Sequence, residues 1–218
     1  MLTITSVEPQ KKNLKRFNIF LDGKFAFGAD EDLIVDHRLV VGKIIQTEDL
    51  EKLLFEAEVG KLMEKMYNWF SFRQHSEKET RDYLKNLSFK RKIKDQDEIS
   101  EVVTSLLIER LKKKGLINDL EFAKAWVDAR RRSKQKGVNA LKSELYQKGI
   151  DREIIDELLE SDDESEEKLA EIALEKKINS WKNLEPKKQK QKALEFLMRK
   201  GFEYDIAKEV IEKMMKMS

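Results

Sequence analysis

Two stretches of the sequence decide the fold, because they match each other at a constant offset of 52 residues. Residues 145–155 read LYQKGIDREII, and residues 197–207 read LMRKGFEYDIA. In each stretch a helical pattern ends in Lys-Gly, a large apolar residue and an acidic residue follow, and a second apolar pattern begins. Gly149 and Gly201 can adopt the left-handed conformation that closes a helix, and the next apolar residue then packs over the last turn. The sequence therefore predicts a helix–turn–helix unit that occurs at least twice.

The apolar spacing around these stretches is helical from Thr47 onward, and signals for helix starts recur along it. Thr47, Ser76 and Asn118 precede acidic first turns, as N-caps do, and Glu185-Pro186 places a proline where its missing N–H is not needed. Further starts are expected at Asp97, Asp151, the capping-box pattern of 161–164, and Glu203. Together these signals predict about nine helices between residues 47 and 217.

Three copies of a three-helix unit account for these helices. An earlier copy, residues 76–84 and 97–111, lacks the glycine and carries instead a basic linker at 90–94. In each unit the matched pair of helices follows a helix that contains one tryptophan. We interpret these side chains as part of the apolar core of each unit rather than as base-stacking platforms: Trp69, Trp126 and Trp181. We expect a mainly α fold of tandem three-helix-bundle repeats, with the boundaries 47–117, 118–160 and 161–218.

Residues 1–46 have a different pattern, with a period of two. Apolar and polar residues alternate over 2–7, 17–21 and 25–27, and Asp22-Gly23 supplies the two positive-φ residues of a tight hairpin turn. Residues 39–45 can form a further short strand. We expect a small N-terminal β module over 1–46, which is too small to be stable alone and packs on the helix that follows.

The composition favours many slender helices over one thick core. Charged residues make up 39% of the chain, against about 25% in an average domain. The absence of cysteine excludes disulfides, a thiol nucleophile and a thiolate zinc site. No apolar run approaches the roughly 20 residues of a membrane span, and the N-terminus does not resemble a signal peptide, so we expect a cytoplasmic protein without a membrane partner.

The sequence contains no recognisable catalytic centre. His37 and His75 lie in unrelated segments without other residues at metal-ligand spacing, and we expect a local turn or solvated role for His75. The phosphate-binding, dinucleotide-binding and nucleophile-elbow glycine motifs are all missing. We therefore expect a protein that is not an enzyme and binds no cofactor or metal.

Clusters of basic residues are the candidate binding sites. The densest spans residues 130–136, with five bases in seven positions, while the acidic stretch 160–167 separates the last two units. Two roles fit such a cluster: bases at a helix end complement the helix dipole, and they also bind phosphates or carboxylates. The first set of candidate contact residues is Arg130, Arg131, Arg132, Lys134 and Lys136, and the second set is Arg73, Lys90, Arg91 and Lys92.

Three segments of the chain resemble the RecX family of recombinase regulators. Residues 116–130, then Gly137 and 141–150, resemble the central signature of that family. Residues 72–79 resemble its first-repeat motif and 192–202 its third. The resemblance covers about 50–217, and the β module is similar to an extension in some members. Two positions depart from the family pattern, with Gln74 where proline is common and Asn118 where aspartate is common.

The resemblance implies an elongated, bent array of three repeats that binds along the groove of a RecA–DNA filament. It also implies inhibition of strand exchange, ATP hydrolysis and the SOS response, with DNA as a secondary partner. We expect a monomer that acts in this way. The alternatives are an independent DNA-binding helical protein and a purely structural adaptor.

Overall fold

A computed structural model describes residues 1–11, 13–160 and 165–216 of the protein. The chain divides into two compact units. The first unit comprises residues 1–74 and 83–116, and the second comprises residues 75–82 and 117–218. The start of the helix over residues 77–92 therefore packs with the second unit, although by sequence it belongs to the first repeat.

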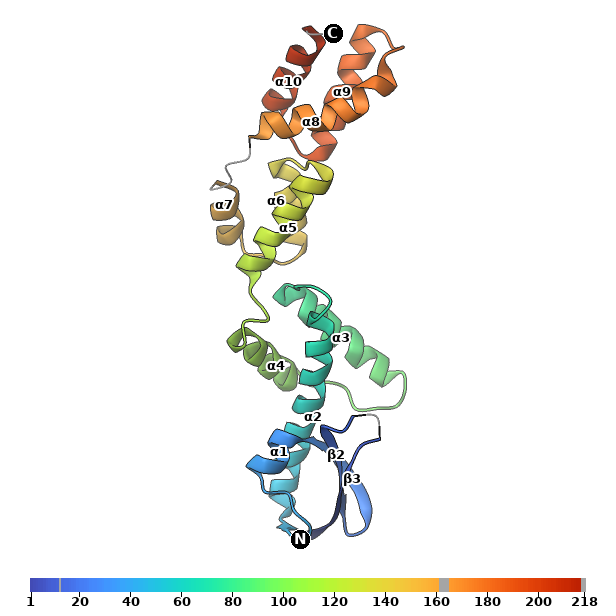
Figure 1. Ribbon diagram of the computed structural model, residues 1–218, viewed down its shortest axis with the longest axis vertical. Coiled ribbons are helices and arrows are strands. Elements are labelled where there is room, and N and C mark those ends of the chain that lie inside the picture. Colours follow the sequence, from blue (N-terminus) through green and yellow to red (C-terminus); the bar gives the residue numbers. More distant parts are fainter. Residues whose placement is uncertain (12, 161–164, 217–218) are drawn as a thin grey trace. The chain divides into compact units, whose positions relative to one another are not determined.

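The N-terminal module is an antiparallel sheet with the strand order β3-β2-β1-β4. Asp22 and Gly23, with φ angles of 46° and 79°, form the predicted hairpin turn between β2 and β3. The sheet packs on the first half of α2, as expected, through a core that includes Ile19, Phe27 and Leu53 (Figure 1). The strands are β1 (Leu2–Pro9), β2 (Arg16–Leu21), β3 (Lys24–Asp30) and β4 (Ile44–Ile45).

Two features of this module differ from the sequence prediction. The strand predicted over 39–45 is reduced to Ile44–Ile45, because the chain turns at Gly42, whose φ is 88°. A short helix, α1 (Glu31–Asp36), was not predicted, and its start is capped by Asp30, whose carboxylate accepts from the N–H of Leu33 at 2.9 Å.

The first unit continues with helical residues whose ends differ from some predicted starts. Thr47 is the first residue of α2 rather than its cap. The start predicted at Asp97 was wrong, because Ser100 caps α4 by accepting from the N–H of Val103 at 3.2 Å. Lys90 to Lys92 form the last turn of α3 and not a linker, since bases are favourable at a helix C-terminus. The helices are α2 (Thr47–Phe70), α3 (Glu77–Lys92) and α4 (Glu101–Lys113).

The second unit contains two bundles, α5–α7 and α8–α10, each with its own apolar core (Figure 1). Trp126 and Trp181 pack against these cores, as the sequence predicts. Asn118 caps α5 and Pro186 opens α9, as expected, while the predicted capping box at 161–164 lies outside the described residues. The elements are α5 (Asp119–Lys134), α6 (Val138–Gln147), α7 (Arg152–Glu160), α8 (Glu166–Ile178), the 3-10 turn η1 (Asn179–Trp181), α9 (Pro186–Lys200) and α10 (Tyr204–Lys216). The described part of the chain from residue 47 onward thus holds nine α-helices, in agreement with the prediction.

The turn after the middle helix of each repeat is closed in the same way. Gly149 and Gly201 have positive φ angles of 77° and 91°, and the N–H of the next residue bonds to the carbonyl five positions earlier, at 3.1 and 3.2 Å. The first repeat makes this closure without glycine. Asp95 takes the left-handed position, with a φ of 52°, and the N–H of Gln96 bonds to the carbonyl of Arg91 at 3.1 Å.

The end of α9 packs head-to-tail against the start of α6, a contact that we call the second joint. The N–H groups of Gly137 and Asn139 donate to the carbonyls of Lys200 and Gly201 at 2.9 and 3.0 Å. A Cβ on Gly201 would lie 2.3 Å from the backbone nitrogen of Ala140, so the approach requires glycine. The positive end of one helix dipole faces the negative end of the other, which also favours the contact.

The end of α6 packs in the same way against the start of α3, and we call this contact the first joint. The hydroxyl of Ser76 donates to the carbonyl of Lys148 at 2.7 Å. A Cβ on Gly149 would lie 2.6 Å from the Cβ of Lys78.

An acidic residue completes each joint. At the first joint the carboxylate of Asp119 accepts from the N–H of Glu77 at 2.9 Å, and at the second the carboxylate of Glu166 accepts from the N–H of Val138 at 3.2 Å. Each acid is the first residue of its helix, and each donor is the first residue of the helix that receives the joint. The internal repeat therefore includes the contacts between successive groups of three helices as well as the helices themselves.

Candidate functional site

The predicted basic cluster of residues 130–136 forms the end of α5 and the turn that leads into α6. Gln135 closes α5 in the left-handed conformation, with a φ of 44°, and its side chain is buried. Its amide nitrogen donates to the carbonyl of Arg132 at 3.0 Å. This bond fixes the turn, so that the flanking basic side chains leave it from defined positions.

Arg130 covers the side of a half-buried tryptophan. Its guanidinium lies 4.1 Å from the centre of the Trp126 ring, and its Nε donates to the carboxylate of Glu144 at 2.6 Å. The Nε1 of Trp126 donates to the same carboxylate at 2.9 Å, and the ammonium of Lys148 lies 4.8 Å from the ring. Two cations of the protein therefore already contact this ring, which agrees with a structural role for Trp126 in its bundle.

Burial would raise the pKa of Glu144, but its hydrogen bonds to Arg130 and Trp126, with the charges of Arg130 and Lys136, hold that pKa below the ordinary value. The carboxylate is thus ionised and serves as the shared acceptor for α5 and the following turn.

Arg131 points into the protein. Its side chain is 3% exposed, and its guanidinium donates to the carboxylate of Glu166 at 2.7 Å. The other oxygen of that carboxylate accepts the N–H of Val138 at the second joint. Arg131 therefore supports the packing of α5 and α6 on α8, and it does not contribute to the surface of the cluster.

The remaining members of the first set reach the surface. Arg132 and Lys134 are exposed. Lys136 is half-exposed, with its ammonium 3.5 Å from the carboxylate of Glu144. The structure thus brings Arg130, Arg132, Lys134 and Lys136 to the surface of one turn and separates Arg131 from them.

Two lysines that the sequence analysis missed join this turn from other helices. The ammonium of Lys176, on α8, donates to the side-chain oxygen of Gln135 at 3.1 Å. The ammonium of Lys200, at the end of α9, donates to the backbone carbonyl of Lys134. We call Lys134, Lys136, Lys176 and Lys200 the turn cluster. Lys200 had a signal in the sequence, because the 52-residue offset pairs it with Lys148 at the first joint.

The second predicted set lies in the other compact unit and is more dispersed. Arg73 and Lys90 are exposed, whereas Arg91 pairs with Glu58 on α2. Lys92 pairs with Glu98 at 2.8 Å, and this hydrogen bond and the charge of Glu98 raise the pKa of Lys92. Arg91 and Lys92 thus already have carboxylate partners within the first unit.

The histidines are not placed for metal binding. His75 is buried, so it is not solvated, and it lies 3.1 Å from the carboxylate of Glu79, which gives it a local role at the start of α3. His37 lies 2.9 Å from Glu56. Among the described residues, no group of three histidine or carboxylate side chains could hold a metal ion.

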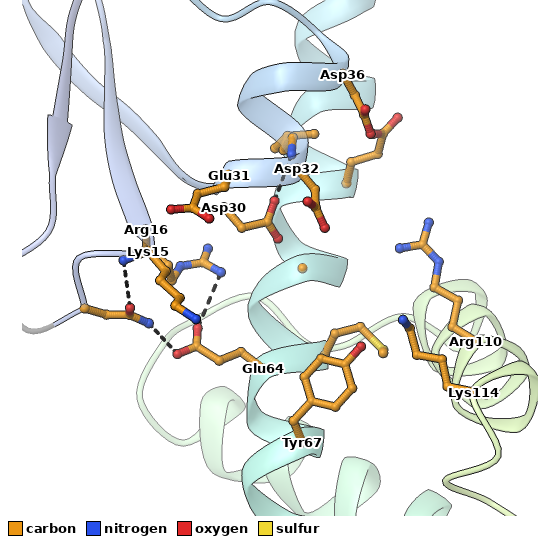
Figure 2. Close-up of a pocket in the computed structure, with 15 residues that line it drawn as sticks. Lys15, Arg16, Asp30, Glu31, Asp32, Asp36, Glu64, Tyr67, Arg110 and Lys114 are labelled. Carbon is orange, nitrogen blue, oxygen red and sulfur yellow. Dashed lines mark hydrogen bonds and ion pairs between the residues drawn. The ribbon is translucent and has the colours of Figure 1, made fainter.

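A cavity of about 610 Å³ lies in the first unit between α1, α2 and α4 (Figure 2). Acidic side chains such as Asp32 and Asp36 stand on one side, while Arg110 reaches in from α4 and Lys114 from the position that follows that helix. At its edge Glu64 accepts from Asn13 at 2.6 Å and lies 3.6 Å from Arg16. These contacts tie residues 13–16 to α2, and the described residues that line the cavity carry charges of both signs.

The fold and the site together define a class of protein: a tandem three-helix-repeat protein with an N-terminal β module and a basic surface at a turn between helices. In the part of the chain that the structure describes, no helix is long and apolar enough to cross a membrane.

The chain belongs to the RecX family of regulatory proteins. Family models match residues 2–46 (the regulatory protein RecX N-terminal domain), 118–159 (the second three-helix domain of RecX) and 164–211 (the third). The chain is 37% identical over 206 residues to the regulatory protein RecX of Bacillus subtilis, with 93% of this chain and 74% of the relative covered. It is 33% identical over 210 residues to that of Listeria monocytogenes, with 95% and 74% covered.

Solved structures of the family have the same fold. A crystal structure of regulatory protein RecX has a TM-score of 0.75 and 26% identity, and it covers 98% of this chain and 100% of that one. The crystal structure of RecX from Lactobacillus salivarius has a TM-score of 0.60 and 26% identity, with 71% and 95% covered.

Proposed function

We propose that this protein binds the RecA–DNA filament and inhibits the recombinase, ATPase and SOS co-protease activities of RecA. Membership of the RecX regulatory family supports this proposal. The observation that carries it at the level of residues is the basic turn between α5 and α6, where Arg132 and Lys134 are exposed and Arg130 and Lys136 are partly exposed beside Glu144. Because a filament presents DNA phosphates beside protein carboxylates, a concentrated group of cations suits such a partner.

Binding of this kind needs a scaffold and no catalytic group. Repeats of three helices offer more than one surface to a partner, and the second joint holds the two bundles of the second unit together. We propose the repeat boundaries at 46, 117 and 160 as the limits of these surfaces. The protein acts in this scheme as a soluble monomer in the cytoplasm.

The test is the ATPase of RecA, stimulated by single-stranded DNA, with this protein added in increasing amounts. We expect ATP hydrolysis to fall as the amount of added protein rises. Unchanged ATP hydrolysis at several-fold molar excess would overturn the proposal.

A second function, independent binding of DNA, is favoured by the convergence of Lys176 and Lys200 on the basic turn. Fluorescence anisotropy with a labelled oligonucleotide in the absence of RecA separates the two. Tight binding with a steep salt dependence favours the independent function, whereas weak binding leaves the filament as the partner. A structural adaptor would show neither inhibition nor DNA binding.

A further inference from the structure

The turn cluster collects four ammonium groups from three segments of the second unit. Lys134 and Lys136 flank Gln135 in the turn, Lys176 comes from α8, and Lys200 comes from the end of α9. Hydrogen bonds to the turn itself hold two of them, since Lys176 binds the side chain of Gln135 and Lys200 binds the backbone of Lys134. The second joint fixes this arrangement, because the N–H of Gly137 bonds to the carbonyl of Lys200 at 2.9 Å.

The charges of this cluster are not neutralised within the described residues. Lys176 and Lys200 donate to uncharged oxygens, and only Lys136 lies near a carboxylate, that of Glu144 at 3.5 Å. That carboxylate already accepts from Arg130 and Trp126. The other nearby acid, Glu166, is engaged by Arg131 and by the N–H of Val138.

The pKa of Lys200 reflects the repulsion among these charges. Burial and the charges of Lys136, Lys176 and Lys134 lower the pKa of its ammonium. The ammonium groups of the cluster therefore repel one another in the folded protein. A bound anion would remove this unfavourable electrostatic energy by neutralising their charges.

We propose that the turn cluster is a binding site for the phosphodiester backbone of a nucleic acid, and that Lys176 and Lys200 are contact residues. The inference rests on the proposed function, since DNA is part of the filament, and it specifies which side chains contact the phosphates. Lysine ammonium groups are compact point charges that bind phosphate oxygens without a fixed fork geometry. Several of them around one turn suit a chain of successive phosphates better than a single carboxylate.

The test compares two variants that remove the same charge from the same repeat. The site variant is Lys176→Gln with Lys200→Gln. The control is Lys187→Gln with Lys190→Gln, two exposed lysines on α9 outside the cluster. Binding of a labelled single-stranded oligonucleotide is measured for each over a series of salt concentrations, without RecA.

We expect the site variant to bind about tenfold more weakly at low salt and the control to bind within about twofold of the parent protein. The slope of log affinity against log salt should fall by about 1.4 in the site variant, which is about 0.7 for each lost phosphate contact to a single strand. Because Lys200 is partly buried, Lys134→Gln with Lys176→Gln serves as a second site variant that changes only exposed side chains.

Equal losses in the site and control variants would overturn the inference, because the effect would then follow net charge alone. Binding of poly-glutamate is measured for the same variants. If the site variant still bound the oligonucleotide but no longer bound poly-glutamate, the inference would also be overturned, and the cluster would be assigned to an acidic protein segment. The proposed function is tested separately by inhibition of the RecA ATPase by the parent protein. If that inhibition is absent while the site variants lose oligonucleotide binding, the proposed function fails and the phosphate site stands.

Discussion

The carbonyl of Gly201 accepts a hydrogen bond from the N–H of Asn139 at 3.0 Å, although the two residues lie in different three-helix bundles. The backbone and Cβ of Ala140 occupy the space that a side chain on Gly201 would need. The second joint is thus a contact between two backbones, and its stability depends on the absence of one methyl group.

Replacing Gly201 with alanine is expected to destabilise the second unit by about 3 kcal/mol or more. The new Cβ would lie 2.4 Å from the Cβ of Ala140, and the φ of 91° is unfavourable for any L-residue. Gly115→Ala is the matched control, because Gly115 also closes a helix with a positive φ, of 69°, and has nothing within 4 Å of its Cβ position. The control should lower the free energy of unfolding by about 1 kcal/mol. Urea unfolding followed by circular dichroism measures both, and equal costs would contradict the steric account.

Asp95→Gly is expected to stabilise the first unit by about 1 kcal/mol. Asp95 closes α3 with a φ of 52°, which an aspartate adopts at a cost and glycine adopts freely. Thermal unfolding of the variant should show a raised midpoint. Asp97→Gly, two residues further on at an exposed position outside the helices, is the control and should not raise it.

Breaking the buried ion pair by Arg131→Met is expected to cost about 3 kcal/mol. It removes the partner of Glu166, whose carboxylate then stays near the joint without its cation. Arg132→Met, at the next and exposed position, should change the stability by less than about 0.5 kcal/mol. A double replacement of Arg131 and Glu166 by methionine that costs as much as the sum of the two single replacements would show that the pair does not interact.

Glu144→Gln is expected to remove a pH-dependent part of the stability. The folded protein holds the pKa of Glu144 below its value in the unfolded chain, despite its burial, because of Arg130 and Trp126. The contribution is therefore complete above the unfolded carboxylate pKa of about 4.3 and is lost as the pH falls through the lower folded value. At neutral pH the variant should lose about 1 kcal/mol, and at pH 3 the difference from the parent protein should shrink. Free energies of unfolding measured across this range check the sign.

The sequence predicted the features that depend on a few neighbouring residues. The Asp22-Gly23 hairpin, the left-handed closures at Gly149 and Gly201 and the proline at the start of α9 all follow from local backbone preferences. The helix count followed from apolar spacing for the same reason. The missed helix α1 is short and carries only one buried side chain, Leu33, so its apolar pattern was too brief to detect.

The candidate site could be predicted only in part, because its geometry depends on residues far apart in the chain. Three consecutive arginines look equivalent in the sequence, yet Arg131 turns inward because Glu166 lies opposite it on another helix. Lys176 stands in ordinary helical surroundings in the sequence, and the repeat that pairs Lys200 with Lys148 does not show that Lys200 reaches the turn. Lys176 and Lys200 reach the turn only because the second joint brings α8 and α9 to it.

The joints give the series of repeats a direction. Each one uses the first N–H of the receiving helix, that of Glu77 or Val138, as a donor to an acid of the incoming unit. The equivalent position of α9 is Pro186, which has no N–H to donate. Any module docked on that end would have to do without this bond. In modular engineering, adding a unit after α10 by copying the existing joints would therefore require replacement of Pro186 first. Exchanging the third bundle for another would preserve the second joint only if the new bundle kept the equivalents of Glu166 and Gly201.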